Sequence, residues 1–245
     1  MIKIENLCKR FGDKVVLDNL SLEFERGKTT VVLGRSGTGK SVLLKLILRL
    51  MDIDSGRIYV DNIDTTDFSE LQMMAVRKKM GMLFQGSALF DSMSVFENVA
   101  YMLREHTSLS ESEIKERVEE KLRFVEMLGT QDLMPSELSG GMQKRIALAR
   151  AMANNPDYIF FDEPTTGLDP ITAQTINELI KRVQVQTHTT VIVVTHDLDS
   201  ANFVGQKFVL LKDGGISFEG TPSEFNNSNI EFVKLFRTGG KVING

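Results

Sequence analysis

The sequence predicts an α/β protein built on a parallel sheet. Two continuous apolar runs, residues 158–161 and 191–194, are typical of central parallel strands that are buried on both faces. A third run, residues 30–33, leads into a glycine-rich turn and then a helical segment, which is the order of a strand–turn–helix unit. The 245 residues suit one large α/β domain or one domain with an inserted subdomain.

The composition is that of a soluble globular protein, with 42% hydrophobic and 25% charged residues. A net charge of -4 and the absence of an evident basic stripe argue against nucleic acid as the main partner. The single cysteine, Cys8, excludes an internal disulfide. The start lacks a signal-peptide pattern, and the longest apolar run is broken by Lys45 and Arg49. We therefore expect a cytoplasmic protein that reaches a membrane only through a partner.

The most informative stretch is residues 34–41, which read G-x-x-x-x-G-K-S and continue into an apolar helical segment from Val42. Its glycines allow a tight, left-handed-tolerant backbone path on which N–H groups converge, and the helix N-terminus adds its dipole. This predicts a nucleotide phosphate site in which Lys40 reaches the β and γ phosphates and the Ser41 hydroxyl binds Mg²⁺. The residues predicted to bind the nucleotide here are Gly34, Arg35, Ser36, Gly37, Thr38, Gly39, Lys40 and Ser41.

The first thirty residues alternate loosely around Gly12 and Gly27, which predicts short antiparallel strands joined by turns. Residues 55–60 resemble a return strand to the same sheet. Phe11 has two interpretations, as an aromatic residue at a hairpin end or as a platform on which adenine stacks. The phosphate loop that follows favours the platform.

Two elements are expected between the phosphate loop and the middle of the chain. Asp67 followed by Glu70 predicts the cap of a helix that runs through Met80. Residues 82–84 predict a buried strand that ends in Gln85.

Residues 86–153 have a different character and predict a helical insertion within the nucleotide-binding core. Ser110 with Glu113 forms a capping box, and residues 139–153 continue the helical pattern. The predicted organisation is a core with a β subdomain at about 1–85 and 154–220, a helical subdomain at about 86–153 and a tail at 221–245.

The last third returns to strands and helices in alternation. Asp169 and Pro170 predict a helix start, as cap and first-turn proline. Residues 208–211 and 216–218 predict a closing hairpin. The tail contains one short amphipathic stretch, residues 230–236, and ends in glycine-rich residues that we expect to be mobile.

Asp162 and Glu163 end a predicted central strand, at the edge of the sheet where α/β proteins bind ligands. Asp162 would hold Mg²⁺, and Glu163 would polarise the attacking water. The alternative is a solvated strand end, which the phosphate loop disfavours. His196 follows another buried run, so we expect it to contact the γ-phosphate and this water, although a lone histidine is also an ordinary hydrogen-bonded loop residue.

Residues 138–142 read Leu-Ser-Gly-Gly-Met and predict a second anion site. Ser139 would cap the following helix, and Gly140 and Gly141 would expose its N-terminus. In isolation, this is only a serine-capped helix. The simplest way for both sites to bind one ATP is a head-to-tail dimer. In such a dimer, the second site of each chain contacts the nucleotide bound by the other chain.

In their order and spacing, these motifs resemble those of the ATP-binding subunits of ABC transporters, and the resemblance covers nearly the whole chain. The matching parts are the phosphate loop, Gln85, residues 138–141, residues 158–163, residues 167–169 and His196. The resemblance implies a RecA-like core, an antiparallel β subdomain and a helical subdomain that carries the signature sequence. It also implies ATP hydrolysis with Mg²⁺, two ATP molecules between two copies, and a separate integral-membrane permease.

The same resemblance implies roles for single residues. Gln85 would sense Mg²⁺ and the membrane partner, and Asp169 would couple the two ATP sites. Met142 departs from the commonest signature, which has Gln, but it lies at the end of the motif.

A narrower resemblance concerns residues 84–100 and 103–106, which look like the ATPase of MCE-type lipid transporters, the Mla phospholipid system. It implies an MCE-domain protein in the same complex and a peripheral position on the cytoplasmic face of the inner membrane. Two alternatives stay open. One is the ATPase of an importer or exporter for an amino acid or other small solute. The other is a soluble ABC ATPase acting on nucleic acid or ribosomes, a class that usually has two cassettes or long coiled-coil insertions.

Overall fold

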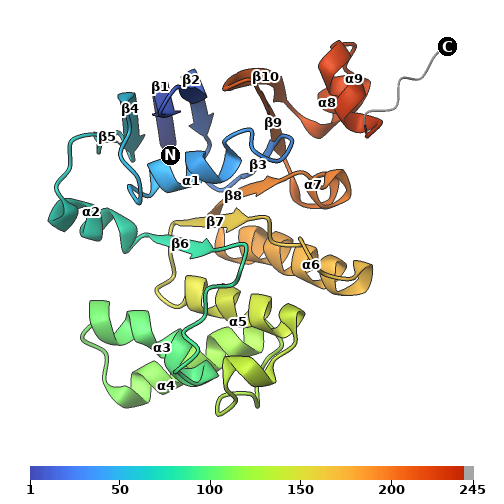
Figure 1. Cartoon of the computed structure of the whole chain (residues 1–245). Coiled ribbons are helices and arrows are strands. Elements are labelled where there is room, and N and C mark those ends of the chain that lie inside the picture. Colours follow the sequence, from blue (N-terminus) through green and yellow to red (C-terminus); the bar gives the residue numbers. More distant parts are fainter. Residues whose placement is uncertain (240–245) are drawn as a thin grey trace. The chain divides into compact units, whose positions relative to one another are not determined.

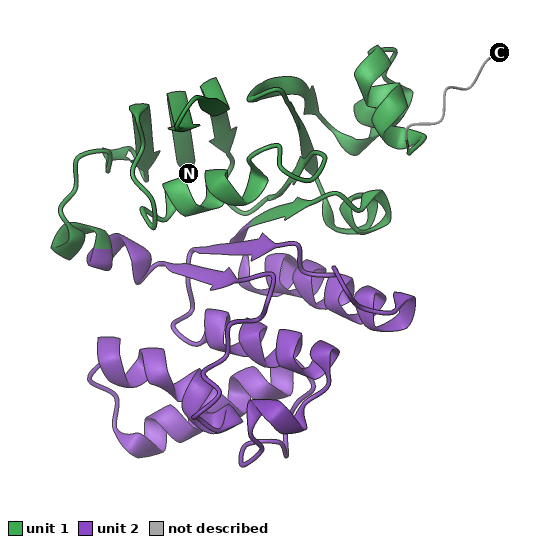
Figure 2. Cartoon of the chain, in the orientation of Figure 1, with its two compact units in different colours: residues 1–73, 192–245 green, residues 74–191 purple. Residues whose placement is uncertain are grey.

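The computed structural model describes residues 1–239, whose elements are labelled in Figure 1. The chain forms two compact units: unit 1 comprises Met1–Met73 and Ile192–Gly245, and unit 2 comprises Met74–Val191 (Figure 2). The chain passes from unit 1 to unit 2 within helix α2 (Glu70–Arg77) and returns within strand β8 (Thr190–Thr195). The predicted boundaries near residues 85 and 153 remain predictions.

Unit 1 contains an antiparallel sheet with the strand order β2-β1-β4-β5. Its strands are β1 (Ile2–Phe11), β2 (Lys14–Phe24), β4 (Ser55–Val60) and β5 (Ile63–Asp64). β1 pairs with both β2 and β4 in antiparallel register. The sequence prediction of antiparallel strands with a return strand at 55–60 is therefore confirmed, although β1 and β2 are longer than the short strands expected.

A second group of strands in unit 1 leads to the phosphate loop. β3 (Thr29–Leu33) is buried at every residue and pairs in parallel with β9 (Lys207–Lys212). β10 (Gly215–Gly220) pairs antiparallel with β9 and forms the predicted hairpin. The loop after β3 opens into α1 (Lys40–Ile47), whose apolar residues pack into the core.

Three shorter helices complete unit 1: α7 (Leu198–Val204), α8 (Pro222–Asn227) and α9 (Glu231–Arg237). α9 confirms the predicted amphipathic stretch, whereas α7 and α8 were not predicted. The glycine-rich end, residues 240–245, lies outside the described residues. Within residues 1–239, no helix is both long enough and apolar enough to cross a bilayer.

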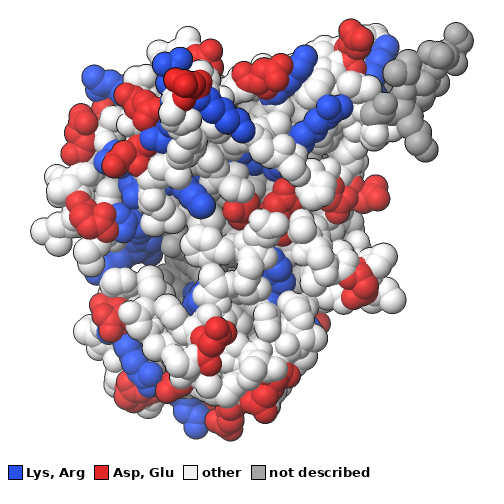
Figure 3. Space-filling model, in the orientation of Figure 1, with Lys and Arg blue, Asp and Glu red and all other residues white. Residues whose placement is uncertain are grey.

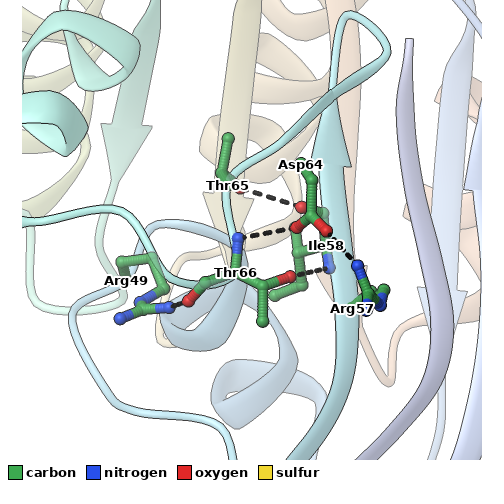
Figure 4. A network of polar contacts seen from close by, with 6 residues as sticks. All are labelled: Arg49, Arg57, Ile58, Asp64, Thr65 and Thr66. Carbon is green, nitrogen blue, oxygen red and sulfur yellow. Dashed lines mark hydrogen bonds and ion pairs between the residues drawn. The ribbon is translucent and has the colours of Figure 1, made fainter.

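A polar network ties the end of α1 to the antiparallel sheet (Figure 4). The Arg49 guanidinium donates to the carbonyl of Thr66. The Thr66 hydroxyl accepts from the Ile58 N–H at 3.0 Å, and Asp64 accepts from the Thr66 N–H at 3.0 Å. Arg57 closes the network with a 2.7 Å ion pair to Asp64. The helix after the phosphate loop is thus fixed to β4.

In unit 2, β6 (Met80–Leu83) and β7 (Tyr158–Asp162) pair in parallel, and β7 is buried at every residue, as predicted. The strand expected at residues 82–84 ends at Leu83, so Gln85 lies in the loop beyond it. α6 (Pro170–Thr187) begins at the predicted Asp169 cap.

The helical part of unit 2 consists of α3 (Val95–His106), α4 (Glu111–Phe124), a 3-10 turn at Pro135–Glu137 and α5 (Gly140–Met152). The predicted capping box of Ser110 and Glu113 is present at the start of α4.

The predicted Asp67–Glu70 cap is wrong. Helix α2 ends at Arg77, and Met80 already belongs to β6. Ser69 and Gln72 make the reciprocal bonds at the helix start, because Gln72 Oε1 accepts from the Ser69 N–H at 2.9 Å and the Ser69 hydroxyl accepts from the Gln72 N–H at 3.4 Å.

Candidate functional site

The phosphate loop of unit 1 has the backbone that its glycines predict. Gly37 and Gly39 have φ values of 80° and 97°, in the left-handed region. Gly39 is the N-cap of α1 and makes no side-chain cap hydrogen bond. This is the arrangement of a helix N-terminus that binds an anion.

The Lys40 side chain lies inside this loop and is only 5% exposed. Its ammonium donates to the carbonyl of Gly34 at 2.9 Å and to that of Arg35 at 3.2 Å. The Thr38 hydroxyl donates to the same Arg35 carbonyl at 2.9 Å. A positive charge is therefore held among the loop carbonyls, while the side chains of Arg35 and Ser36 are exposed.

Phe11 ends β1 and is 47% exposed. The Lys9 ammonium lies 5.6 Å from the centre of its ring and forms a 2.7 Å ion pair with Asp54. The second Asp54 oxygen accepts from the Arg10 N–H at 2.6 Å. The hydrogen bond from Lys9 lowers the pKa of Asp54 below its usual value. Phe11 is thus an exposed ring on an anchored strand end, which suits a stacking platform.

The acidic pair of unit 2 is nearly buried: Asp162 is 6% and Glu163 8% exposed. This burial does not fit a solvated strand end. Glu163 has a φ of 49°, a left-handed conformation that costs free energy for a residue with a Cβ. The Thr166 hydroxyl donates to Glu163 Oε2 at 3.1 Å. Buried carboxylates and a strained backbone are both features that concentrate at functional sites.

Gln85 is exposed on the loop after β6, and a lysine of α5 holds the backbone of that loop. The Lys144 ammonium donates to the carbonyl of Gln85 and, at 3.5 Å, to that of Phe84. Burial lowers the pKa of Lys144, and the charges of Asp162 and Glu163 oppose this shift. The structure therefore brings Gln85 and the acidic pair to the same lysine. Sequence reasoning missed Lys144, although a lysine inside an apolar helical pattern was an available signal.

Ser139 caps α5 as predicted, since its hydroxyl accepts from the Met142 N–H at 3.3 Å. A Cβ at Gly141 would lie 2.3 Å from the Cγ2 atom of Thr172, so a larger residue here would force the Thr172 side chain to shift. The Thr172 hydroxyl in turn donates to Asp169 at 2.5 Å, and this bond is the main cause that lowers the pKa of Asp169. The signature glycines and Asp169 therefore lie on adjoining helix starts.

His196 follows β8 in unit 1 and is exposed, directly before the Asp197 cap of α7. Within the described part of the chain, no group of three or more His, Cys, Asp or Glu residues could hold a metal ion. Ser41 of unit 1 and Asp162 of unit 2 are each predicted to bind Mg²⁺ through an oxygen, and Gln85 is predicted to sense the ion. Such a donor set fits Mg²⁺, which keeps several waters and is bound through one or two carboxylates together with substrate phosphates.

Comparison with known proteins agrees with this geometry. A family model described as ABC transporter matches residues 17–166. The intermembrane phospholipid transport system ATP-binding protein MlaF of Haemophilus influenzae is 44% identical over 238 residues, which cover 96% of this chain and 90% of that protein. The probable ribonucleotide transport ATP-binding protein mkl of Mycobacterium leprae is 36% identical over 98% of this chain and 70% of that protein.

A solved structure is similar over most of its length. It is the dimeric structure of an ATP-binding cassette in a post-hydrolysis state, bound to ADP and Pi. The TM-score is 0.83 at 35% sequence identity, and the match covers 90% of this chain and 98% of that one.

Proposed function

This chain belongs to the ABC transporter family and is an ABC ATPase, and we propose that it powers a phospholipid transport system of the MCE type. The observation that carries the proposal is the 44% identity with an MlaF protein over 96% of the chain. The resemblance of residues 84–100 to the same group supports it, because this stretch includes the segment after Gln85 where the family docks its permease.

Residues of unit 1 bind the ATP. The loop amides and the Lys40 ammonium hold the phosphates, and Phe11 stacks on the adenine. Ser41 would contribute a hydroxyl to Mg²⁺, Asp162 would hold the ion, and Gln85 would sense it. When bound there, Mg²⁺ would supply positive charge that offsets the negative charge developing on the phosphate during transfer.

Hydrolysis depends on the buried carboxylate of Glu163, which orients and polarises the attacking water. His196 contacts the γ-phosphate and the same water. The near burial of Glu163, at 8% exposed, supports this role, because a carboxylate with little water around it interacts more strongly with a bound nucleophile.

The active assembly is a homodimer formed on ATP. Ser139 and Gly141 of one copy complete the phosphate site of the other, and Asp169 couples the two sites. The packing of Gly141 against Thr172, which is bonded to Asp169, supports this coupling.

The membrane partners are an integral-membrane permease and an MCE-domain protein, with this chain peripheral on the cytoplasmic face of the inner membrane. The segment after Gln85 is suited to docking. It exposes Phe90, whose ring centre lies 5.1 Å from that of Tyr101, an exposed residue of α3.

Nucleic acid is not expected among the partners. The net charge is -4, and Figure 3 shows acidic and basic side chains interspersed over the visible face. A polyanion binds best to a continuous basic surface. The similarity to a protein named for ribonucleotide transport keeps a small-solute transporter as the second candidate.

A pull-down tests the proposal. Tagged Glu163→Gln protein, with ATP and Mg²⁺, is recovered from detergent-solubilised membranes of its host, and the partners are identified by mass spectrometry. Lys40→Ala protein is the control for nucleotide dependence. We expect a multi-spanning permease together with an MCE-domain protein. A permease with a solute-binding protein would keep the ATPase and discard lipid transport, and soluble partners alone would sink the transporter proposal.

A further inference from the structure

Helix α5 holds the Gln85 loop along its flank. In addition to the Lys144 contacts with the carbonyls of Phe84 and Gln85, the Arg150 guanidinium donates to the carbonyl of Ala88 at 2.7 Å and to that of Ser87 at 2.9 Å. Two cations of one helix thus bind the carbonyls of two pairs of neighbouring residues in one loop. The same helix presents the signature residues at its N-terminus.

Lys144 is the more unusual of the two cations, because it is only 5% exposed. A buried ammonium loses hydration and is tolerated when hydrogen bonds and opposite charge compensate. Its hydrogen-bond partners are backbone carbonyls of the Gln85 loop, and Asp162 and Glu163 supply the opposite charge. An apolar residue would fill this position without the free-energy cost of removing a charge from water, so the presence of a lysine calls for a functional explanation.

The helix is also packed closely on the strand that leads to Gln85. A Cβ at Gly81 in β6 would lie 2.2 Å from the carbonyl oxygen of Ala151 in α5. Parallel pairing joins Gly81 to Ile159 in β7, the strand that ends in Asp162. Because close-packed elements transmit small displacements, a movement of α5 is carried to β6 and its following loop.

We infer that Lys144 is a positioning residue. It links helix α5, which carries the signature, to Gln85, Asp162 and Glu163 of the same copy, the residues proposed to act on Mg²⁺ and on the attacking water. It holds the backbone of Gln85 to α5 and places its charge opposite Asp162 and Glu163. When the ATP of the partner copy engages Ser139 and Gly141, α5 is held in place and with it the local Gln85 loop. This inference rests on the proposed function of the signature and of Gln85.

The test uses Lys144→Met and Lys144→Arg in the full chain, with and without Glu163→Gln. A matched control is Lys121→Met, because Lys121 is also 5% exposed in unit 2 but is bound to Glu120 at 2.8 Å and Asn155 at 2.7 Å. The rate of ATP hydrolysis is measured as a function of the ATP concentration and of the Mg²⁺ concentration. In the Glu163→Gln background, light scattering measures the Mg²⁺ concentration needed for ATP-driven dimerisation.

We expect Lys144→Met to lower kcat about tenfold or more while changing KM for ATP less than about threefold. In the Glu163→Gln background, the Mg²⁺ requirement for dimerisation should rise at least about threefold, with Lys144→Arg close to the parent and Lys121→Met unchanged. If Lys144→Met does not fold, Lys144→Gln takes its place, with the same expected directions.

Two results would overturn the inference. One is a Lys144→Met protein whose kcat and Mg²⁺ requirement match those of the parent. The other is an equal effect of Lys121→Met, which would reduce Lys144 to a general stability role. Gln85→Ala distinguishes a failure of the proposed function from a failure of the inference alone. If this variant has an unchanged Mg²⁺ requirement, or if the Glu163→Gln parent never dimerises, the proposed function is contradicted and the inference falls with it.

Discussion

At the scale of single residues, Glu163 combines burial with a left-handed backbone, and Glu163→Gln tests the purpose of that combination. The amide keeps the size and a hydrogen-bonding group but cannot take a proton from water. We expect ATP binding at wild-type affinity, ATP-driven dimerisation and hydrolysis slower by about a hundredfold or more, measured as phosphate release.

The control for that variant is Glu178→Gln, an exposed glutamate on α6 that should leave turnover unchanged. Wild-type turnover in Glu163→Gln would remove Glu163 from the catalytic role. A loss of both ATP binding and turnover would instead indicate a structural role for the carboxylate.

Lys40→Ala tests the phosphate loop. The substitution removes an ammonium held between the carbonyls of Gly34 and Arg35, so the loop loses its buried positive charge. We expect ATP affinity to fall at least about tenfold, measured by titration with a fluorescent ATP analogue. Lys45→Ala, an exposed lysine of the same helix, is the matched control. Unchanged affinity in Lys40→Ala would contradict the phosphate-site proposal.

Sequence reasoning identifies those site residues whose signal is local. The phosphate loop and the Ser139 cap depend on spacing within a few residues, and both have the predicted backbone. Lys144 was missed because its role depends on the carbonyl of Gln85, a contact between distant parts of the chain. Helical periodicity cannot say which loop a side chain will meet across such a separation.

At the scale of elements, Asn98 organises the loop after Gln85. Its side chain is fully buried; Nδ2 donates to the carbonyls of Phe90, Met93 and Ser94 at 3.0–3.1 Å, and Oδ1 accepts from the Phe90 N–H at 2.8 Å. One polar side chain of α3 therefore bonds the backbone of the loop at Phe90, Met93 and Ser94.

Asn98→Leu is expected to lower the free energy of unfolding by about 2–5 kcal/mol, because the Phe90 N–H and the Met93 carbonyl lose the side chain that bonds them. Urea denaturation measures the change, and Asn202→Leu on the exposed side of α7 is the control. The variant should also recover less permease in the pull-down. Stability equal to wild type would mean that the loop backbone does not need Asn98.

The predicted elements were correct where one local signal dominated. The continuous apolar runs became the buried strands β7 and β8, and Ser110 with Glu113 capped α4. The α2 start was assigned wrongly because acidic residues at 67 and 70 suggested a cap, whereas Ser69 lies directly before the helix. Its end was wrong because Met80 pairs with Tyr158 of β7, and strand pairing prevails over helical continuation.

At the scale of the whole molecule, the α/β class with an antiparallel N-terminal sheet and added helices was predictable from the sequence. The division into Met1–Met73 with Ile192–Gly245 and Met74–Val191 was not. Such a division follows from contacts between residues far apart in the sequence, which composition and periodicity do not report.

The head-to-tail dimer makes a prediction about mixed variants. Lys40→Ala disables a phosphate loop, and Ser139→Arg places a bulky side chain at the signature end of α5, where Ser139 is exposed. If each ATP lies between the loop of one copy and the signature of the other, a mixed dimer has one site with both defects and one site with neither. Each variant alone has no intact site.

Mixing equal amounts should therefore restore turnover to about a quarter of the wild-type rate, because about half of the dimers are mixed and one of their two sites is intact. Coupling between sites through Asp169 would lower this value. Lys40→Ala mixed with Glu163→Gln is the control: Glu163 serves the loop of its own copy, so no site is intact and no turnover returns. If the Ser139→Arg mixture also stays inactive while both variants remain folded and mixed dimers form with ATP, the signature does not act on the partner's ATP.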